Sequence, residues 1–506
     1  MSRRALTAGT LSFKLLQLGV SGVSNLILIP LYLRHIEMSE YGAWTAVSAA
    51  SACLSLIDPD VPNLLIQCVG RSQGAADPRA SMGFIKAGLL IALVSSTLAM
   101  LIGQVLSGRV PALVGVPEAS FQVCTRMLQF GAVSVGLMLL AHALNGAALG
   151  LQSATSAGLP PIAGSLARLI AATVCLRANL GVMSIAYAEL TAATVFLATS
   201  AALFLRTLRS SGLHPGLSPG YEQLRAFWNL ALSGFGSRVG RLVAGNLDSL
   251  AIAHYCGATQ LAQFSVASTA ARHSENLVTH SVASLRPALA HLSGEGGRAA
   301  PREITVRLVC WLIWSLGFFA AGLFALSDQF LTAWLGSQRP SASPVYLWIP
   351  LLFLASAWNT SLNTLVYSLG EIRTAMRIDL ISAVILVPAV IAGGMVWALP
   401  GILAALFSVG ILVNAWALTA SLASRVGMTR DSLGILAHAS VTAAAAGIAL
   451  WFACHGTRSG SWLTFALNAA AGTAVYALAL SLCSARFRAD LRSLAARARS
   501  RSRRRA

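Results

Sequence analysis

The chain has 506 residues, of which 56% are hydrophobic and only 10% are charged, and its mean hydropathy is +0.70. A soluble domain carries about 25% charged residues, so this composition excludes a soluble protein and indicates a polytopic membrane protein. The net charge of +19 does not indicate nucleic-acid binding, because the sequence has no RNA-binding motif with interleaved aromatic residues. Most basic residues lie in short loops between apolar runs, which is typical of a topology signal and of contact with anionic membrane lipids.

Membrane-spanning helices need about 20 largely apolar residues each. By this criterion the sequence predicts an all-α integral membrane fold with about fourteen transmembrane helices. The predicted spans lie near residues 10–33, 43–68, 83–107, 120–149, 157–177, 182–206, 224–255, 260–290, 304–326, 344–369, 376–398, 400–424, 433–454 and 462–484. The division at Pro400-Gly401 is the least distinct of these boundaries.

Both ends of the chain are expected in the cytoplasm. The first predicted span is too long and too polar on one face for a cleaved signal peptide, so we expect it to be retained. With the N-terminus inside, basic residues collect in the inside loops and in the tail. The outside loops then hold only Arg34, Arg109, Arg177, Arg339 and Arg458.

The longest polar connection, residues 209–221, is rich in Gly, Pro and Ser and is typical of an irregular linker. We therefore expect two pseudo-symmetric six-helix lobes around a central cavity, with two extra helices and a tail. The predicted boundaries are 1–206 for the N-terminal lobe, 207–223 for a cytoplasmic linker, 224–424 for the C-terminal lobe, 425–484 for the extra helices and 485–506 for a basic cytoplasmic tail. A shift of 223 residues aligns Asn25 with Asp248, as expected for duplicated halves with a site between them.

Catalytic and metal chemistry are not indicated. The loops are too short for a catalytic domain, so we expect no enzymatic activity. The cysteines show neither a CxxC pair nor a Cys/His metal spacing, so we expect no disulfide, metal or other cofactor.

The seventh and eighth predicted spans carry charges at hydrocarbon depth. These are Arg238, Arg241 and Asp248 on the first, and Arg272 and Glu275 on the second. Their spacings of three and four residues place them on one face of each helix. Such charges cost at least a few kcal/mol each, so they normally face a bundle interior or a watery cavity. The sequence therefore predicts a basic cavity inside the helical bundle.

Several short segments, in order along the whole chain, resemble the polysaccharide (O-antigen and exopolysaccharide, Wzx-type) flippases. These segments are Leu28-Ile-Pro-Leu-Tyr-Leu-Arg34, Ser39-Glu-Tyr-Gly-Ala-Trp44, Leu54-Ser-Leu-Ile-Asp58, Gly245-Asn-Leu-Asp248, Leu285-Arg-Pro-Ala-Leu289, Phe330-Leu-Thr-Ala-Trp-Leu-Gly336 and Ser368-Leu-Gly-Glu-Ile-Arg373. The resemblance implies a fold shared with multidrug exporters of the same superfamily. The chain departs from the family pattern after Asp58, where Pro59-Asp60-Val61-Pro62-Asn63 should kink or break the second span.

The resemblance also implies a substrate, an oligosaccharide on a polyprenyl diphosphate. Arginine suits a diphosphate because its planar fork donates several hydrogen bonds to phosphate oxygens. The expected substrate-binding residues are Arg238, Arg241, Arg272, Lys14, Gln17 and Asn25. The expected ion-coupling residues are Glu275, Asp248 and Asp58, since an intramembrane carboxylate beside an arginine can exchange a proton or a cation.

A structural interpretation of the same residues stays open. Arg272 with Glu275, or Arg241 with Asp248, would then form permanent salt bridges, and Asp58 would cap a broken helix. Arg168, near a span end, is expected to extend toward the membrane interface. Polar stripes such as that of Lys14, Gln17 and Asn25 would serve as contacts between helices.

The sequence thus predicts a bacterial inner-membrane flippase that moves an undecaprenyl-diphosphate-linked oligosaccharide by alternating access. Its expected partners are this lipid-linked substrate and membrane lipids, with polysaccharide polymerase or export proteins as further candidates. The nearest alternatives are a small-molecule exporter and a lipid II flippase of the same superfamily. A membrane glycosyltransferase or polymerase is the alternative of a different class.

Overall fold

The computed structural model describes residues 3–75, 77–113, 121–211, 221–283, 299–336, 340, 345–369, 371–455 and 460–493. The side chains of some helical residues, among them Arg241, are outside this description. Within the described ranges the chain is helical and forms no strand, which confirms the all-α prediction. Large apolar side chains remain exposed, for example Val105 at 77% and Leu463 at 71%, as expected of a surface that lipid covers.

The described residues contain ten helical stretches long and apolar enough to cross a membrane. One of them, Arg373–Val426, covers two predicted spans. The predicted spans 43–68, 224–255 and 260–290 are not among the ten. The first and third are divided into helices of fewer than 18 residues in the described part of the chain, and polar and charged residues lower the hydropathy of the second. The total of about fourteen therefore stays a prediction.

The chain divides into two compact units, of which unit 1 comprises residues 1–266 and 376–406. Its helices are α1 (Arg3–His35), α2 (Met38–Cys53), η1 (Leu54–Ile57), α3 (Val61–Gly74), α4 (Pro78–Leu106), α5 (Val110–Leu113), α6 (Phe121–Gly150), η3 (Ala154–Ala157), α7 (Leu159–Arg177), α8 (Met183–Ser210), α9 (Tyr221–Cys256), α10 (Ala258–Ala267) and residues 376–406 of α15 (Ile372–Val409). Small residues let these helices approach closely. On α6, a Cβ at Gly146 would lie 2.5 Å from the carbonyl oxygen of Pro62, so α3 packs directly on the α6 backbone.

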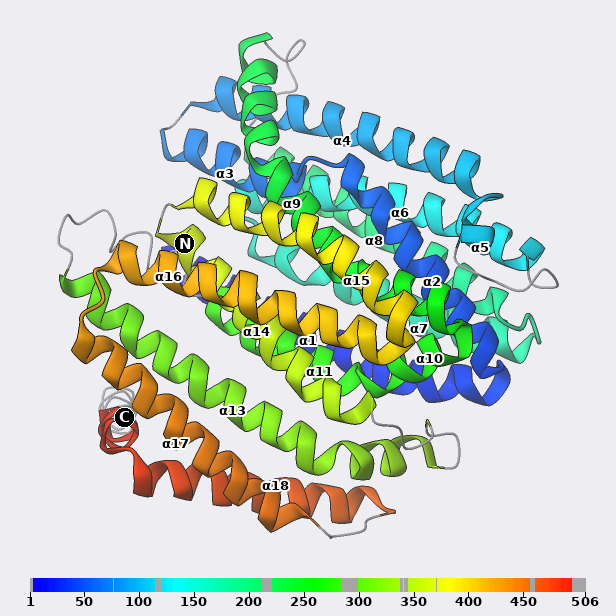
Figure 1. The fold of residues 1–506 in the computed structure, drawn as a ribbon. Coiled ribbons are helices and arrows are strands. Elements are labelled where there is room, and N and C mark those ends of the chain that lie inside the picture. Colours follow the sequence, from blue (N-terminus) through cyan, green and yellow to red (C-terminus); the bar gives the residue numbers. More distant parts are fainter. Residues whose placement is uncertain are drawn as a thin grey trace, which may run out of the picture. The chain divides into compact units, whose positions relative to one another are not determined.

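Unit 2 comprises residues 267–375 and 407–506. It contains α11 (Thr269–Ala283), α13 (Ala299–Leu335), α14 (Val345–Ser368), the π-helix η5 (Gly410–Ala415), α16 (Trp416–Val426), α17 (Arg430–Cys454) and α18 (Trp462–Cys483), followed by a short helix over residues 485–493. Figure 1 shows α13, α17 and α18 as neighbouring long helices. Their shared core includes Trp314, Leu450 and Tyr476.

The second predicted span is broken, as the Pro-rich segment indicates. Helix α2 tightens into the 3-10 turn η1, and a new helix, α3, begins at Val61. Asp60 lies between them with φ of 68°, in the left-handed region. The break follows from proline chemistry, because Pro59 and Pro62 lack the N–H groups that would continue the α2 hydrogen-bond ladder.

Helix α15 also contains a break, at Ala398 (φ 50°, ψ −128°), two residues before the boundary predicted at Pro400-Gly401. The backbone reverses there, so that a Cβ built at Gly401 would lie 2.0 Å from the carbonyl oxygen of Gly393. The helical segments before and after Ala398 can approach so closely because Gly393 and Gly401 both lack a side chain. The predicted spans 376–398 and 400–424 therefore lie on either side of this reversal.

Ala398 has a positive φ that residues other than glycine rarely adopt. Replacing it with glycine should relieve this strain and stabilise the protein by about 1 kcal/mol. The melting temperature of the purified protein in detergent measures the effect. Ala392→Gly, at an exposed helical position of the same arm, is the control and should destabilise by roughly the same amount. A lower melting temperature for Ala398→Gly would contradict the inference that the backbone at Ala398 is strained.

Candidate functional site

Arg238 of α9 is held at the break between η1 and α3. Its Nη1 donates to Asp58 Oδ2 at 2.9 Å and to Asp60 Oδ1 at 3.2 Å. Its Nη2 donates to the carbonyl oxygen of Ser55 at 3.2 Å. The side chain of Asp58 is 4% exposed and that of Arg238 is 18% exposed, whereas Asp60 is 35% exposed. We call Asp58, Asp60 and Arg238 the carboxylate–arginine node.

The local sequence explains how the node forms. Asp58 Oδ1 accepts from the backbone N–H of Val61 at 3.2 Å, so one oxygen caps α3 and the other pairs with Arg238. Asp60 Oδ1 accepts from Asn63 Nδ2 at 2.9 Å, which holds this carboxylate at the first turn of α3. A carboxylate near a helix N-terminus is favoured by the free N–H groups and the helix dipole. Asp58 therefore does cap the broken helix.

A second charged cluster joins α1, α7 and α8. Arg168 Nη1 donates to Glu189 Oε1 at 3.1 Å, and its Nη2 donates to Asn25 Oδ1. Arg168 was expected to extend toward the interface, but it pairs within the bundle. The Arg168 Nε and the hydroxyl of Tyr32, a residue 5% exposed, are buried without a hydrogen-bond partner in the described part of the chain.

The polar face of α1 contacts α7, where the hydroxyl oxygens of Ser21 and Ser165 lie 3.1 Å apart. Lys14, at the start of this face, is exposed. Gln17 of α1 and Asn145 of α6 each bury a side-chain oxygen that has no hydrogen-bond partner among the described residues. Unpartnered polar atoms inside a bundle mark places where water or a polar ligand can bind.

The remaining predicted residues of unit 1 lie further along α9. Asp248 Oδ1 accepts from the backbone N–H of Ser249 at 2.6 Å and from its hydroxyl at 3.2 Å. The side chain of Arg241 is outside the described part of the structure, so the suggested pair of Arg241 with Asp248 is not described.

Arg272 and Glu275 both lie on α11 in unit 2. Arg272 is exposed, and the half-buried Glu275 accepts from the hydroxyl of Ser356 on α14 at 2.5 Å. This contact joins two helices that the sequence did not pair. The substrate and coupling roles of these residues stay predictions.

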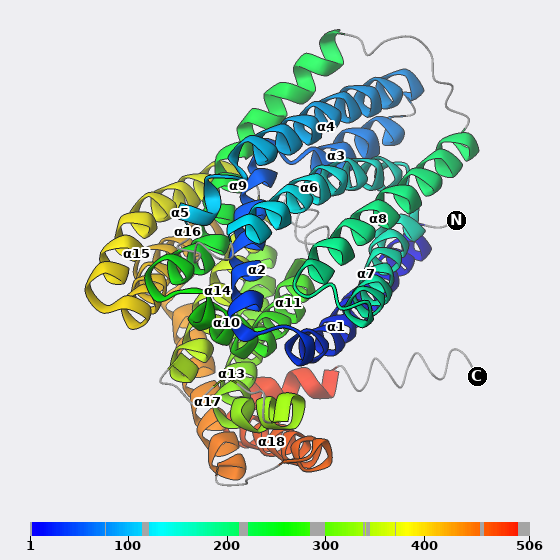
Figure 2. The ribbon, with the colours of Figure 1, turned by 90° about the vertical axis from the view of Figure 1, so that its right-hand side faces the viewer.

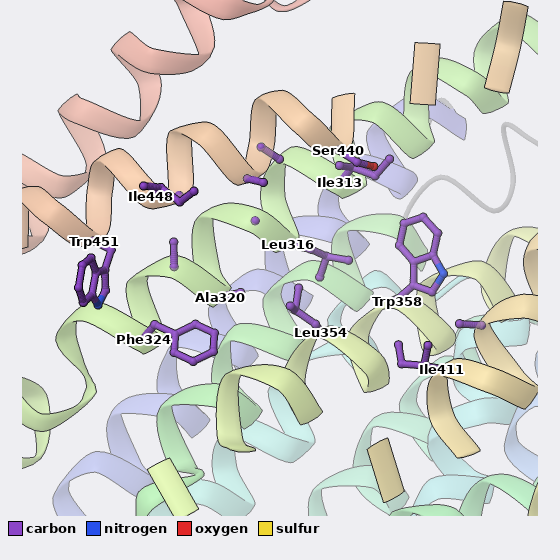
Figure 3. Close-up of a pocket in the computed structure, with 16 residues that line it drawn as sticks. Ile313, Leu316, Ala320, Phe324, Leu354, Trp358, Ile411, Ser440, Ile448 and Trp451 are labelled. Atoms are coloured by element: carbon purple, nitrogen blue, oxygen red, sulfur yellow. The ribbon is translucent and has the colours of Figure 1, made fainter. Parts of the chain in front are cut away.

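An apolar cavity of about 630 Å³ lies within unit 2. Figure 3 shows its wall, to which α13, α14, the π-helix and α17 contribute. The labelled lining residues are Ile313, Leu316, Ala320, Phe324, Leu354, Trp358, Ile411, Ser440, Ile448 and Trp451. Ser440 is the one hydroxyl-bearing residue of the lining. Phe324 and Ile448 are 41% and 58% exposed, so the cavity is open rather than enclosed.

The wall of this cavity includes an irregular helix turn. Ile411 and Ala415 belong to the π-helix, and Asn359, which follows the lining residue Trp358 on α14, donates to the carbonyl oxygen of Gly410 at 2.9 Å. π-helical turns occur mostly as single insertions at functional sites. The extra residue they insert widens the helix on the side of the cavity.

Sequence reasoning missed two charged or polar partners and the cavity. Glu189 lies inside an apolar span, and the rule that intramembrane carboxylates deserve a functional hypothesis would have identified it. Ser356 had no distinguishing signal among many serines. The cavity depends on which apolar faces fail to close against each other, which periodicity alone does not reveal.

The helical units, the broken second span and the open apolar cavity define the fold of a polytopic integral membrane protein. The structure is similar to the lipid II flippase MurJ in its inward closed conformation, with a TM-score of 0.63 and 13% identity over 94% of this chain and 98% of that one. It is also similar to the MATE multidrug transporter DinF-BH, with a TM-score of 0.60 and 14% identity over 84% and 96% of the two chains. The MATE transporter VcmN from Vibrio cholerae, in its bent form, gives a TM-score of 0.56 and 15% identity over 85% and 99%.

Sequence comparison adds nothing to these likenesses, since no protein-family model and no curated protein matches the chain. Identities of 13–15% establish the fold alone. The protein is thus an integral membrane protein with the fold found in MurJ and in MATE transporters. This fold is the one that the resemblance of the sequence motifs implied, and membership of the Wzx-type family stays a prediction.

The carboxylate–arginine node should contribute strongly to stability. Arg238→Met leaves Asp58 buried without its counter-charge, which we expect to cost about 3–5 kcal/mol. Adding Asp58→Asn should recover part of this loss, because the uncompensated charge is removed. The melting temperatures of the single and double variants in detergent give the coupling between the two positions.

Asp60 provides the matched control for this cycle. It contacts the same guanidinium but is more exposed, so solvent screening should make its coupling to Arg238 smaller. If Asp58 and Asp60 couple equally to Arg238, or if the Arg238→Met variant is as stable as the wild type, burial does not determine how much the node contributes to stability.

Proposed function

We propose that the protein is a flippase that translocates a polyprenyl-diphosphate-linked oligosaccharide across the bacterial inner membrane. The observation on which the proposal depends is the open apolar cavity of unit 2. Support also comes from the fold, which is similar to a lipid II flippase over 94% of this chain and to MATE transporters over 84–85%. Both termini are proposed to be cytoplasmic, and the lobes and linker to have the boundaries predicted from the sequence.

The cavity has the size and chemistry for a lipid chain. A methylene-sized group occupies about the 30 Å³ of a liquid water molecule, so a volume of about 630 Å³ accommodates on the order of twenty carbon atoms. Its lining is apolar apart from Ser440, which leaves little to bind a charged drug or a sugar. A polyprenyl chain needs only this kind of surface.

An apolar cavity in a membrane protein orients a chain more than it attracts one. Lipid is as apolar as the cavity lining, so burial there gives little hydrophobic driving force. The binding energy of a lipid-linked substrate must therefore come from its anionic head. We propose that Arg238, Arg241 and Arg272 hold the diphosphate, with Lys14, Gln17 and Asn25 near the sugar, because guanidinium groups pair well with phosphate oxygens.

The coupling of transport to an ion is proposed for Asp58, Asp248 and Glu275. Of the three, Asp58 has the most suitable surroundings, because it is buried and shares a guanidinium with a second carboxylate. A carboxylate in such surroundings changes its proton or cation occupancy when the guanidinium moves.

A small-molecule exporter is the second candidate, since the MATE multidrug transporters share the fold. The open apolar cavity favours the lipid-linked substrate over this alternative. A lipid II flippase differs from the first proposal only in the attached sugar and peptide, which the apolar cavity would not distinguish.

Filling the cavity should test its role. In proteoliposomes, wild-type protein should flip a fluorescent polyprenyl-diphosphate oligosaccharide, and Ala444→Trp should slow this by at least about tenfold because an indole there obstructs the lipid chain. Ala444 lines the cavity on α17 and is exposed, so the larger side chain can be accommodated without disrupting the helix core. A dithionite quenching assay of the outer leaflet gives the rate.

The matched control is Ala445→Trp, an exposed position on the same helix that does not line the cavity. It should flip the substrate at the wild-type rate. Equal rates for both variants would remove the cavity from the transport path. Absence of flipping by the wild type, together with export of a small organic cation, would overturn the proposed function in favour of the exporter.

A further inference from the structure

A short helix over residues 485–493 follows the last long helix of unit 2 and turns across its axis. Helix α18 ends at Cys483, and Ser484, fully buried with φ of −121° and ψ of 106°, makes the turn. The Ser484 hydroxyl then accepts from the backbone N–H of Phe487 at 3.2 Å and so caps the new helix. In Figure 1 this red helix is seen nearly end-on while α18 lies across the view, and Figure 2 shows the reverse.

One face of this helix is fixed to α13. Phe487, 7% exposed, lies with its ring centroid 5.6 Å from that of Trp311 and 5.2 Å from that of Trp314. Asp490, 9% exposed, accepts from Arg307 Nη2 at 2.8 Å and from Trp311 Nε1 at 2.9 Å. The spacing of three between Phe487 and Asp490 places both on one side of the helix, so its opposite side is free for other contacts.

The opposite face is basic. Arg488 and Arg492 are exposed on it, four residues apart, whereas Leu491, 40% exposed, lies at the edge of the packed face beside Phe487. Arg488 reaches back to the end of α18, where its Nη1 donates to the carbonyl oxygens of Ser481 at 2.5 Å and Leu482 at 2.9 Å. Leu482 of α18 is itself 70% exposed, so lipid-facing apolar surface lies directly beside the charged groups.

This combination is that of a helix at the membrane interface. A helix turned across the axis of a span, with arginines beside an exposed leucine, lies parallel to the membrane surface at the level of the headgroups. The same end of unit 2 carries further basic residues, Arg307 near the start of α13 and Arg430 at the start of α17. Arg486 also belongs to this helix, and the sequence beyond it continues with arginines up to Arg505.

We propose that residues 485–493 form a binding site for anionic phospholipid headgroups, with Arg488 and Arg492 as the phosphate-binding residues. Guanidinium groups donate paired hydrogen bonds to phosphate oxygens, and Leu491 inserts between the acyl chains. The packing of Phe487 and Asp490 on α13 holds the arginines in place before lipid binds. Bound lipid therefore secures the α13–α18 end of unit 2 to one leaflet, independently of the transported substrate.

Lipid retention by the full-length protein tests this site. Protein in nanodiscs of phosphatidylglycerol and phosphatidylcholine in equal amounts is released into a native mass spectrometer, and the bound lipids are counted. The wild type should retain phosphatidylglycerol over phosphatidylcholine. Arg488→Gln/Arg492→Gln should lower phosphatidylglycerol retention on the order of thirtyfold, because two arginines near the anionic surface are lost.

Two further variants make the result specific. Arg109→Gln/Arg177→Gln removes two exposed arginines elsewhere in the chain and should retain lipid as the wild type does. Arg488→Lys/Arg492→Lys keeps the charge and should keep most of the binding, which separates headgroup binding from misfolding of the helix. Equal retention of phosphatidylglycerol by the wild type and the glutamine variant would overturn the proposal, as expected if this face instead binds a soluble protein.

Discussion

The bond between Arg238 and Asp58 is the constraint on which unit 1 depends. The second predicted span stops being a regular helix at residue 54 and resumes at Val61, so its free backbone groups and two carboxylates lie inside a bundle. A single guanidinium from α9, distant in sequence, satisfies both carboxylates and one free carbonyl oxygen. A break in a span is stable here because its polar groups are paired.

The sequence predicted the class of fold well and the pairing of its charges poorly. Apolar runs are local properties, and ten helical stretches of sufficient length and hydropathy are present in the described part of the structure. The break at Pro59-Asp60 could also be predicted, since proline disrupts the helix in which it lies. The partner of Arg238 could not be predicted, because helical periodicity gives the face on which a residue lies but not the helix that this face contacts. Arg168 was misjudged for the same reason, as Glu189 lies on another helix.

Three predicted spans that are not among the ten membrane-crossing stretches carry the charges that the sequence singled out. Residues 43–68 contain Asp58, residues 224–255 contain Arg238 and Asp248, and residues 260–290 contain Arg272 and Glu275. A helix that faces a polar interior gives up part of its lipid-like composition. The apolar cavity of unit 2 differs from these polar positions, because its lining stays lipid-like.

Unit 1 is discontinuous in sequence, since it ends at residue 266 and is completed by residues 376–406. During synthesis its last helical arms emerge only after roughly one hundred residues of unit 2 have been made, a delay on the order of ten seconds at common translation rates. Residues 1–266 are therefore inserted into the membrane while the surface around Gly240 and Tyr255 is still uncovered. This surface is covered only when residues 376–406 of α15 bring Asp379 and Gly394 against it. The two halves of this chain are consequently not separable folding units, whatever their history as repeats. A fragment that stops at residue 266 would contain α9 but lack the segment that packs on Gly240 and Tyr255.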